Sequence, residues 1–492
     1  MDPYYNFKKS LLSYFRSRLI ILIITSIYSL LILLLVVNRF WQFEAFYYNQ
    51  GYYESSVWNI SRFKPPIVDH QALGRVNIFA DHFIPSIFLL SPLYWFTKSY
   101  LTTPVAVSIG VGISVLIAYE IASKLIRSRF LTFSLLFAYM FFVGLQNALI
   151  TFLDPIVLMT PFLMFLFWTI LNDKIKLFYP IFLINLGFKE TVASLGLTLG
   201  IFLFFYKKSW KKHGLKIILI SITYALLVTR LIIPRFAPSS NFFYEPNWIL
   251  VLKEFLPRFF FPLIKTQTIF ASLAAFGFLP LFIPFFLPLI LQDFILRFVV
   301  VYQSALRWDL GLHYNANLAV LLFVGSVLSV HKLQDYKFFK KVYIPLAIFI
   351  IFITIIFHRF VYHGPFGLLY NPEFYKHTGR QQFMWDFIRK IPKEGKIMTQ
   401  SNLAVFFTHE DLYIIRDCQK INRYKPDVIA FDIRSGQNPN NLFPTDEKTL
   451  RELTKILDNQ SGYSKLFDDG SRYIYTKRKD KEVVIKCPQN EY

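Results

Sequence analysis

The segment LIILIITSIYSLLILLLVV, residues Leu19–Val37, decides the class of protein to which this chain belongs. Its 19 residues carry no charge, and a helix of that length rises about 28 Å, enough to cross the hydrocarbon core of a bilayer. The run is too long for the core of a secretory signal, and no small-residue cleavage site follows it. We therefore expect an uncleaved helix that anchors the chain in a membrane.

Apolar runs of similar length recur as far as Ile356, which indicates a polytopic membrane protein. Hydrophobic residues make up 54% of the 492 residues and charged residues only 17%, whereas soluble domains carry about 25% charged residues. This shortage of polar surface excludes a soluble enzyme, a disordered protein and a fibrous repeat. We expect about eleven transmembrane helices and a proline-broken pair within 273–300. The segment 82–96 is expected to be an interfacial or re-entrant helix, and the segment 177–206 is expected to cross twice or to dip and return.

The net charge of +22 arises mostly from five short basic segments between the apolar runs. Such segments are typical of loops that stay in the cytoplasm under the positive-inside rule. The N-terminus is then cytoplasmic, and the large first loop, 38–81, lies on the outer side. Because the basicity reflects topology, we expect no nucleic-acid partner. The five segments are Lys8–Arg18, Lys124–Arg129, Lys174–Lys176, Lys207–Lys216 and Lys332–Lys341.

The composition changes after residue 361. Residues 363–492 hold 21 Lys or Arg and 17 Asp or Glu, and strand-like runs alternate there with helix-like runs, which favours a small α/β domain. We therefore divide the chain into a transmembrane helical domain, 1–361, and an extracytoplasmic α/β domain, 362–492. Its two cysteines, Cys418 and Cys487, are too few for a disulfide framework and lack metal-site spacing. The expected strands are Lys396–Gln400, Leu412–Ile415, Asp427–Asp432 and Arg472–Thr476.

Most acidic residues before position 363 fall on the predicted outer side. Carboxylates beside membrane helices are costly and usually face a cavity or a partner, although many loop acids only contact solvent. An outer carboxylate can take the proton of an acceptor hydroxyl, and Lys, Arg or His can neutralise a departing phosphate. The pairs Lys189-Glu190 and His313-Tyr314 are candidates of this kind, with a local ion pair and an interfacial anchor as the respective alternatives.

Four stretches resemble, in order, the motifs of a prokaryotic membrane family called domain of unknown function 2079. The first is Tyr48–Asn59, YNQGYYESSVWN, which is similar to the family pattern Tyr-Asp-x-Gly-x-x-Asp-Gln-x-x-Trp-Asn. Asp81–Tyr94, Phe188–Glu190 and His313-Tyr314 follow. The resemblance continues into the tail at Ile391-Pro392, Gln400–Asn402, Asp427–Asp432 and Asp469-Gly470.

The layout of that family resembles the C-type glycosyltransferases, which move a sugar from a polyprenyl-phosphate donor on the extracytoplasmic face. The resemblance implies a multi-pass glycosyltransferase in the cytoplasmic membrane of a prokaryote. Its partners would be a polyprenyl-phosphate sugar lipid and membrane lipids. The motifs identify no protein partner and no cofactor, and they leave the use of a divalent cation open.

The resemblance also assigns roles to residues. Asn49 stands where the family has its first Asp, and an amide cannot act as a base. Glu54 is therefore the first choice for the catalytic carboxylate, with Asp81 and Glu44 as alternatives. We expect Glu54, Asp81-His82, Lys189-Glu190 and His313 to converge on one outer cavity. The candidate substrate-binding residues are Asn49, His82, Lys189, Glu190, Arg307, His313 and Tyr314.

Two other classes of function remain open at the level of sequence. Broken helices and charges near the membrane also suit a transporter or flippase, although the chain shows no two similar halves. A non-catalytic envelope protein, whose outer domain binds a glycan or another protein, is the third interpretation.

Overall fold

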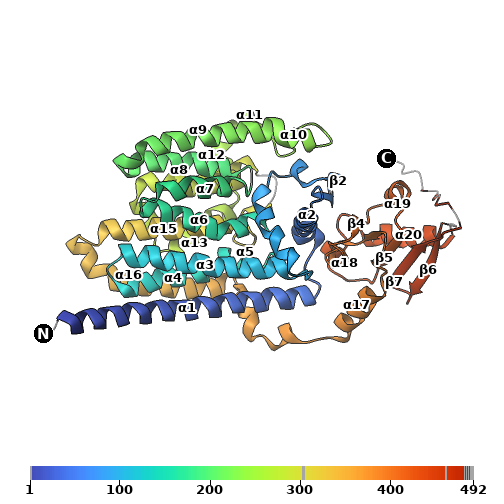
Figure 1. The fold of residues 1–492 in the computed structure, drawn as a ribbon, viewed down its shortest axis with the longest axis horizontal. Helices are drawn as coiled ribbons and strands as arrows, with labels where there is room; N and C mark the ends of the chain where they lie inside the picture. Colours follow the sequence, from blue (N-terminus) through green and yellow to red (C-terminus); the bar gives the residue numbers. More distant parts are fainter. Residues whose placement is uncertain are drawn as a thin grey trace.

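The computed structural model describes residues 3–301, 305–459 and 462–480 together with 482, 483, 485 and 487, and side chains from residue 18 onward. The helices of the first 361 residues lie side by side in one bundle (Figure 1). The strands of the C-terminal part lie beyond one end of that bundle, at the end opposite the N-terminus (Figure 1).

Five helices in the described part of the chain are long and apolar enough to cross a membrane, and a bent pair makes a sixth. The pair is α4 (Arg129–Phe141) and α5 (Val143–Leu149), which meet at 45°. The other five contain α1 (Pro3–Trp41), α3 (Thr102–Leu125), α9 (Lys211–Leu227), α15 (Asn315–Leu333) and α16 (Lys337–Ile356). The expected total of eleven crossings remains a prediction, because it also counts shorter and broken helices.

The shorter helices follow the expected pattern. An apolar helix, α6 (Pro155–Leu171), precedes a hairpin of α7 (Ile175–Leu186) and α8 (Val192–Tyr206), and Lys189-Glu190 lies in the hairpin turn. The segment expected to be re-entrant forms η3 (Pro85–Trp95), a 3₁₀ helix. At about 2 Å per residue, η3 is too short to span a bilayer.

Prolines break the chain between 276 and 288, as expected. The helix α13 (Leu263–Ala275) ends before two short 3₁₀ turns, η6 (Leu279–Phe282) and η7 (Pro284–Phe286). The chain then continues as α14 (Leu287–Ile295) and η8 (Leu296–Val300).

The centre of the bundle is α15, which is buried on all sides from Asn315 to Val330. A helix that is apolar all round belongs in a core, and α15 packs against α3, α4, α5, α6 and α14. Its packing holds these five helices in place around the centre of the bundle.

The first outer loop folds over one end of the bundle. It contains η1 (Tyr47–Gly51), α2 (Tyr52–Ser61), η2 (Ile78–Ala80) and an antiparallel hairpin of β1 (Ile67–His70) and β2 (Gly74–Asn77). The sequence patterns did not predict this hairpin, because four-residue strands are too short to show alternation.

The C-terminal part contains a five-stranded mixed sheet with the order β4-β3-β5-β7-β6. The strands β3, β4 and β5 are parallel, and β7 and β6 are antiparallel additions at one edge. All four expected strands lie within one residue of observed ones, whereas β6 was not expected. A disulfide joins Cys418 to Cys487. The strands are β3 (Lys396–Thr399), β4 (Asp411–Ile414), β5 (Val428–Asp432), β6 (Tyr463–Asp468) and β7 (Arg472–Lys477).

Charge pairs attach this sheet to the first outer loop. The two terminal guanidinium nitrogens of Arg416, Nη1 and Nη2, donate to Asp69, each at 2.9 Å. The Ile414 amide donates to the same carboxylate at 2.7 Å. Arg75 forms a second pair with Asp411 at 2.7 Å. The hydrophobic core is also continuous between the two parts, so the sheet is fixed against the loop rather than tethered by a linker.

The basic segments meet at the opposite end of the bundle. Arg127 pairs with Asp335 at 2.6 Å, and Lys207 pairs with Asp173 at 2.5 Å. Lys124, in the last turn of α3, donates to Asn172 at the end of α6 at 2.5 Å, so the ends of these two helices are linked. This arrangement gathers the positive charge at one end of the bundle, which is the end that we predict to face the cytoplasm.

The orientation of the bundle is testable by cysteine labelling. Both natural cysteines are in the disulfide, so an introduced thiol is the single reactive one. We expect Asn440→Cys, in an exposed turn, to react with an impermeant maleimide on intact cells, and Lys212→Cys to react only after lysis. Labelling at position 212 without lysis would reverse the orientation.

Candidate functional site

Buried and half-buried polar side chains gather where the first outer loop meets the beginnings of η3, α6 and α15. They come from distant parts of the chain, and we call them the outer polar cluster. The cluster consists of Asp81, His82, Asp154, Lys189, Glu190, Tyr244, Arg307 and His313.

Asp81 lies between η2 and η3 and is 3% exposed. Its carboxylate accepts a hydrogen bond from the Tyr244 hydroxyl at 2.8 Å and lies 3.5 Å from His70 Nε2. Burial alone would raise the pKa of Asp81, but His82, His70 and Tyr244 outweigh it, so the pKa lies well below its usual range. Asp81 is therefore ionised at neutral pH.

His82 lies between two carboxylates. Its Nδ1 is 2.9 Å from Glu190 Oε1, and its Nε2 is 3.7 Å from Asp81 Oδ2. The Tyr244 ring stacks on the imidazole with centroids 4.8 Å apart. Burial raises the pKa of Glu190, but His82 and Lys189 lower it by more. The pKa of Glu190 therefore lies below its usual value. The Lys189-Glu190 turn and the start of η3 are thus held together electrostatically.

Asp154 connects α6 to the cluster. One oxygen caps α6 by accepting the Ile156 amide at 2.8 Å, and the other lies 3.3 Å from His313 Nε2. Burial lowers the pKa of His313 to about 4; Asp154 opposes this shift, whereas Lys189, Arg307 and His82 add to it. The mutual effects of these groups show that they share one electrostatic environment.

Two cations of the cluster, Lys189 and Arg307, form no ion pair with a carboxylate of another described residue. Lys189 is 8% exposed, and its ammonium group forms no ion pair or hydrogen bond with another described residue. The Arg307 guanidinium lies 4.9 Å from the Tyr314 ring centroid, and its buried Nε finds no hydrogen-bond partner among the described residues. Both side chains line a cavity of about 80 Å³, together with Tyr314 and Asn317. Cationic donors that line a cavity without a carboxylate partner suit an anionic ligand.

Arg297 supports the segment that carries Arg307 and His313. Its Nε donates to the Arg307 carbonyl at 2.9 Å, and its Nη2 donates to the Asp309 carbonyl at 2.8 Å. Its Nη1 donates to the Asn315 side chain at 2.9 Å and to Asp293 at 3.2 Å. The guanidinium therefore fixes the backbone on both sides of the cluster's last loop.

We expect the lowered pKa of His313 to appear in the pH dependence of stability. A free histidine titrates near 6.5, so between about pH 6.5 and 4 the unfolded state binds a proton that the folded state does not. Stability should fall as the pH is lowered through this window. Thermal unfolding at several pH values should show a smaller fall for His313→Gln, whereas exposed His377→Gln should keep the wild-type slope. Equal slopes for His313→Gln and wild type would contradict this assignment.

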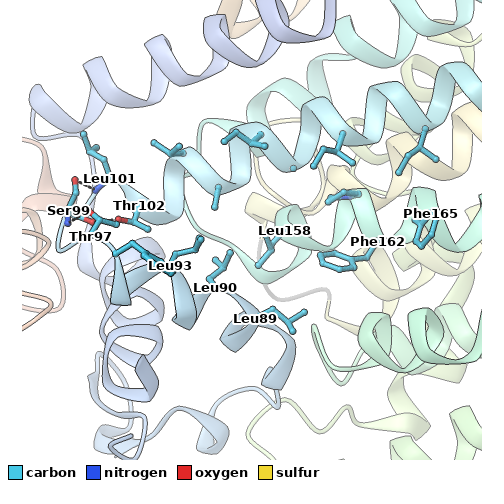
Figure 2. Close-up of a pocket in the computed structure, with 18 residues that line it drawn as sticks. Leu89, Leu90, Leu93, Thr97, Ser99, Leu101, Thr102, Leu158, Phe162 and Phe165 are labelled. Carbon is cyan, nitrogen blue, oxygen red and sulfur yellow. Dashed lines mark hydrogen bonds between the residues drawn. The ribbon is translucent and has the colours of Figure 1, made fainter. Parts of the chain in front are cut away.

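A long apolar groove begins beside the cluster. It has a volume of about 890 Å³ and is lined by η3, α3 and α6. Figure 2 shows Leu89, Leu90 and Leu93 of η3 and Leu158, Phe162 and Phe165 of α6 along its walls. Thr97, Ser99 and Thr102 lie at one end (Figure 2). No charged side chain lines the groove, so it suits a hydrocarbon chain.

Two of the elements that line the groove, α6 and η3, begin next to residues of the outer polar cluster. Asp154 caps α6, and Leu158 lines the groove one turn later, about 6 Å along the helix. His82 lies three residues before the start of η3, whose leucines line the groove. A third link is the pair Phe162 and Phe188, whose ring centroids are 5.3 Å apart, because Phe188 adjoins Lys189.

Glu54 lies in a second cluster, at the junction with the C-terminal sheet. Its carboxylate is 1% exposed and accepts hydrogen bonds from Tyr94, from Thr103 at 2.5 Å and from His409 at 3.1 Å. The His409 ring stacks on Trp58 with centroids 3.9 Å apart. We call Glu54, Tyr94, Thr103 and His409 the junction cluster.

The structure brings together most, but not all, of the residues expected to share a cavity. Asp81, His82, Glu190 and His313 lie in the outer polar cluster, and Lys189, Arg307 and Tyr314 line the cavity of about 80 Å³ beside them. Glu54 instead makes its hydrogen bonds within the junction cluster, among the residues that the structure describes.

The remaining candidates lie apart from both clusters. Glu44 pairs with Arg39 at 2.6 Å and is 45% exposed. The Asn49 side chain accepts the Phe46 amide at 3.2 Å, which closes the turn at the start of η1.

Sequence reasoning missed several contributors to the site. Asp154 was recognised only as an outer acid, although Asp154-Pro155 before an apolar run is a helix N-cap signal that would have placed it. His70, Tyr244, Arg297 and His409 had no local signal, because tertiary packing alone brings them to their partners. Within the described residues, no group of three or more His, Cys, Asp or Glu could hold a metal ion.

The comparisons with known proteins agree with this architecture. The family model "Predicted membrane protein (DUF2079)" matches residues 39–466. No curated protein matches the chain. Among solved structures, ArnT from Cupriavidus metallidurans bound to undecaprenyl phosphate is similar, with a TM-score of 0.53 and 11% sequence identity over 93% of this chain and 98% of ArnT. At this identity the likeness shows a shared fold. Because the family model covers most of its length, the chain belongs to the family of predicted membrane proteins DUF2079, which confirms the resemblance seen in its motifs.

Proposed function

We propose that this protein is a membrane glycosyltransferase that uses a polyprenyl-phosphate-linked sugar at the extracytoplasmic face of a prokaryotic cytoplasmic membrane. The observation that carries the proposal is that η3 and α6, which line the apolar groove, both begin next to residues of the outer polar cluster. A polyprenyl chain in the groove would have its phosphate at the cluster. The fold shared with ArnT, whose structure holds undecaprenyl phosphate, supports this placement.

In the proposed reaction an acceptor hydroxyl attacks the anomeric carbon of the donor sugar. The new glycosidic bond forms as the bond between that carbon and the phosphate oxygen breaks, and polyprenyl phosphate leaves with the electron pair. Lys189 and Arg307 are placed to neutralise the leaving phosphate, since neither is paired with a carboxylate in the described part of the chain.

The proton of the acceptor hydroxyl needs a carboxylate, and Asp81 is our choice for this base. His82 and Tyr244 fix the orientation of its carboxylate, which lies in the same cluster as Lys189 and Arg307. Glu54 was the first choice from the sequence, but its hydrogen-bond partners belong to the junction cluster and include neither Lys189 nor Arg307. We therefore assign Glu54 to positioning of the C-terminal part.

The test is transfer from a radiolabelled polyprenyl-phosphate sugar in membranes that contain the protein. Label in an acceptor, lost in Lys189→Gln, supports the glycosyltransferase. Movement of the labelled lipid between leaflets without transfer would indicate a flippase. If neither occurs, a non-catalytic envelope protein with a glycan- or protein-binding outer domain becomes the better interpretation.

A further inference from the structure

A second large apolar groove lies at the other end of the bundle, where the basic segments meet. It has a volume of about 740 Å³, and the outer polar cluster contributes nothing to it. Its walls come from the α13–η6 turn, the end of α15 and the first half of α16. The lining side chains include Leu279, Phe282, Leu333, Phe338, Leu346 and Phe349.

The groove exists because one connection of the bundle lacks a polar loop. Residues 266–292, which contain the turn from α13 to α14, carry no charged side chain, unlike the five basic segments. Phe282 and Phe285 in this turn are 52% and 53% exposed. An uncharged turn with exposed phenylalanines suits contact with the apolar part of a membrane. The neighbouring helix α15 ends just after Lys332, and α16 begins at Lys337. An apolar recess therefore lies beside charged helix ends.

Cations lie along the rim of this recess. Lys332 lines the groove itself. Lys341 is three residues from Phe338 and four from Pro345, both of which line the groove, so it lies on the edge of the same helix face. Neither lysine forms an ion pair with another described residue, and the nearby Asp335 is already paired with Arg127.

We propose that this groove binds an anionic phospholipid of the leaflet that faces the basic segments. One acyl chain fills the space between η6 and α16, and the phosphate lies against Lys332 and Lys341. Charge complementarity selects the headgroup, because a zwitterionic lipid offers no net charge to these lysines. The site is independent of the proposed sugar transfer, since it shares no residue with the outer polar cluster or with the first groove.

The experiment is a thermal-shift titration of the purified full-length protein in a non-ionic detergent. We expect phosphatidylglycerol to raise the unfolding temperature at a concentration at least about tenfold lower than phosphatidylcholine with the same acyl chains. Lys332→Gln/Lys341→Gln should weaken phosphatidylglycerol binding by about fivefold for each lysine. Glycerol 3-phosphate, which has the charge but no chain, should produce no shift.

The matched control is Lys212→Gln/Lys216→Gln, two exposed lysines one turn apart at the start of α9 that do not line the groove. It should change phosphatidylglycerol binding by less than about twofold. Equal responses of the wild type to the two phospholipids would overturn the proposal, and so would equal losses in the two double variants or a shift with glycerol 3-phosphate. If the groove variant does not fold, the wild-type comparison and native mass spectrometry of co-purified lipid decide the question.

Discussion

Replacement of Asp81 by Asn is expected to lower the rate of sugar transfer by about 10²- to 10⁴-fold, the usual effect of removing a general base. The amide keeps an oxygen that can accept the Tyr244 hydroxyl, so the local packing should survive. The loss should therefore appear in kcat at an unchanged expression level. The measurement is the initial rate of transfer by purified wild type and variant.

The matched comparison for this prediction is Glu44→Gln. Glu44 was an alternative base from the sequence, but it is 45% exposed and pairs only with Arg39 in the described part of the chain. Exposed pairs contribute about 0–1 kcal/mol to stability, and we expect transfer to stay within about twofold of wild type. A large loss in Glu44→Gln with normal activity in Asp81→Asn would overturn the assignment of the base.

Replacement of Glu54 by Gln is expected to reduce the free energy of unfolding by about 1–3 kcal/mol. The Glu54 carboxylate accepts hydrogen bonds from Tyr94, Thr103 and His409. Glutamine offers one acceptor oxygen instead of two. Its NH₂ group would therefore face one of these three donors inside a buried site, and that donor would lose its hydrogen bond. Sequence reasoning alone expects a stable but inactive variant, whereas these contacts lead us to expect a destabilised one. Thermal unfolding and limited proteolysis of the C-terminal part measure the effect.

A double-mutant cycle distinguishes the two roles of Glu54. His409→Ala should also destabilise the protein, and the Glu54→Gln/His409→Ala variant should lose less than the sum of the single losses, because the two residues interact directly. A Glu54→Gln protein that melts at the wild-type temperature but transfers no sugar would identify Glu54 as the base instead.

The sequence predicted those features of the fold that depend on local pattern. Apolar length gives the long helices, prolines give the break after Ala275, and charge gives the common end of the basic segments. The hairpin β1–β2 and the strand β6 were missed because short or irregular strands have little alternation. The disulfide between Cys418 and Cys487 connects residues 69 positions apart, which spacing alone does not pair.

The candidate site was predictable where motifs carry its residues. Asp81-His82, Lys189-Glu190 and His313 were all identified, and the structure places them in one electrostatic environment. The position of Glu54 was not predictable, because its partner His409 belongs to a different part of the chain. A helix places neighbouring residues on different faces, so Tyr53 can lie near Asp81 and Asp154 while Glu54 contacts the C-terminal part.

The central claim is that one polyprenyl phosphate occupies both the groove between η3, α3 and α6 and the outer polar cluster. A cryo-electron microscopy structure of the protein in nanodiscs with added polyprenyl phosphate tests this claim most directly. We predict chain density along Leu158 and Phe162, with the phosphate within about 3 Å of Lys189 or Arg307. A phosphate held at Thr97 and Ser99 instead of at Lys189 or Arg307, or a groove without chain density, would contradict it.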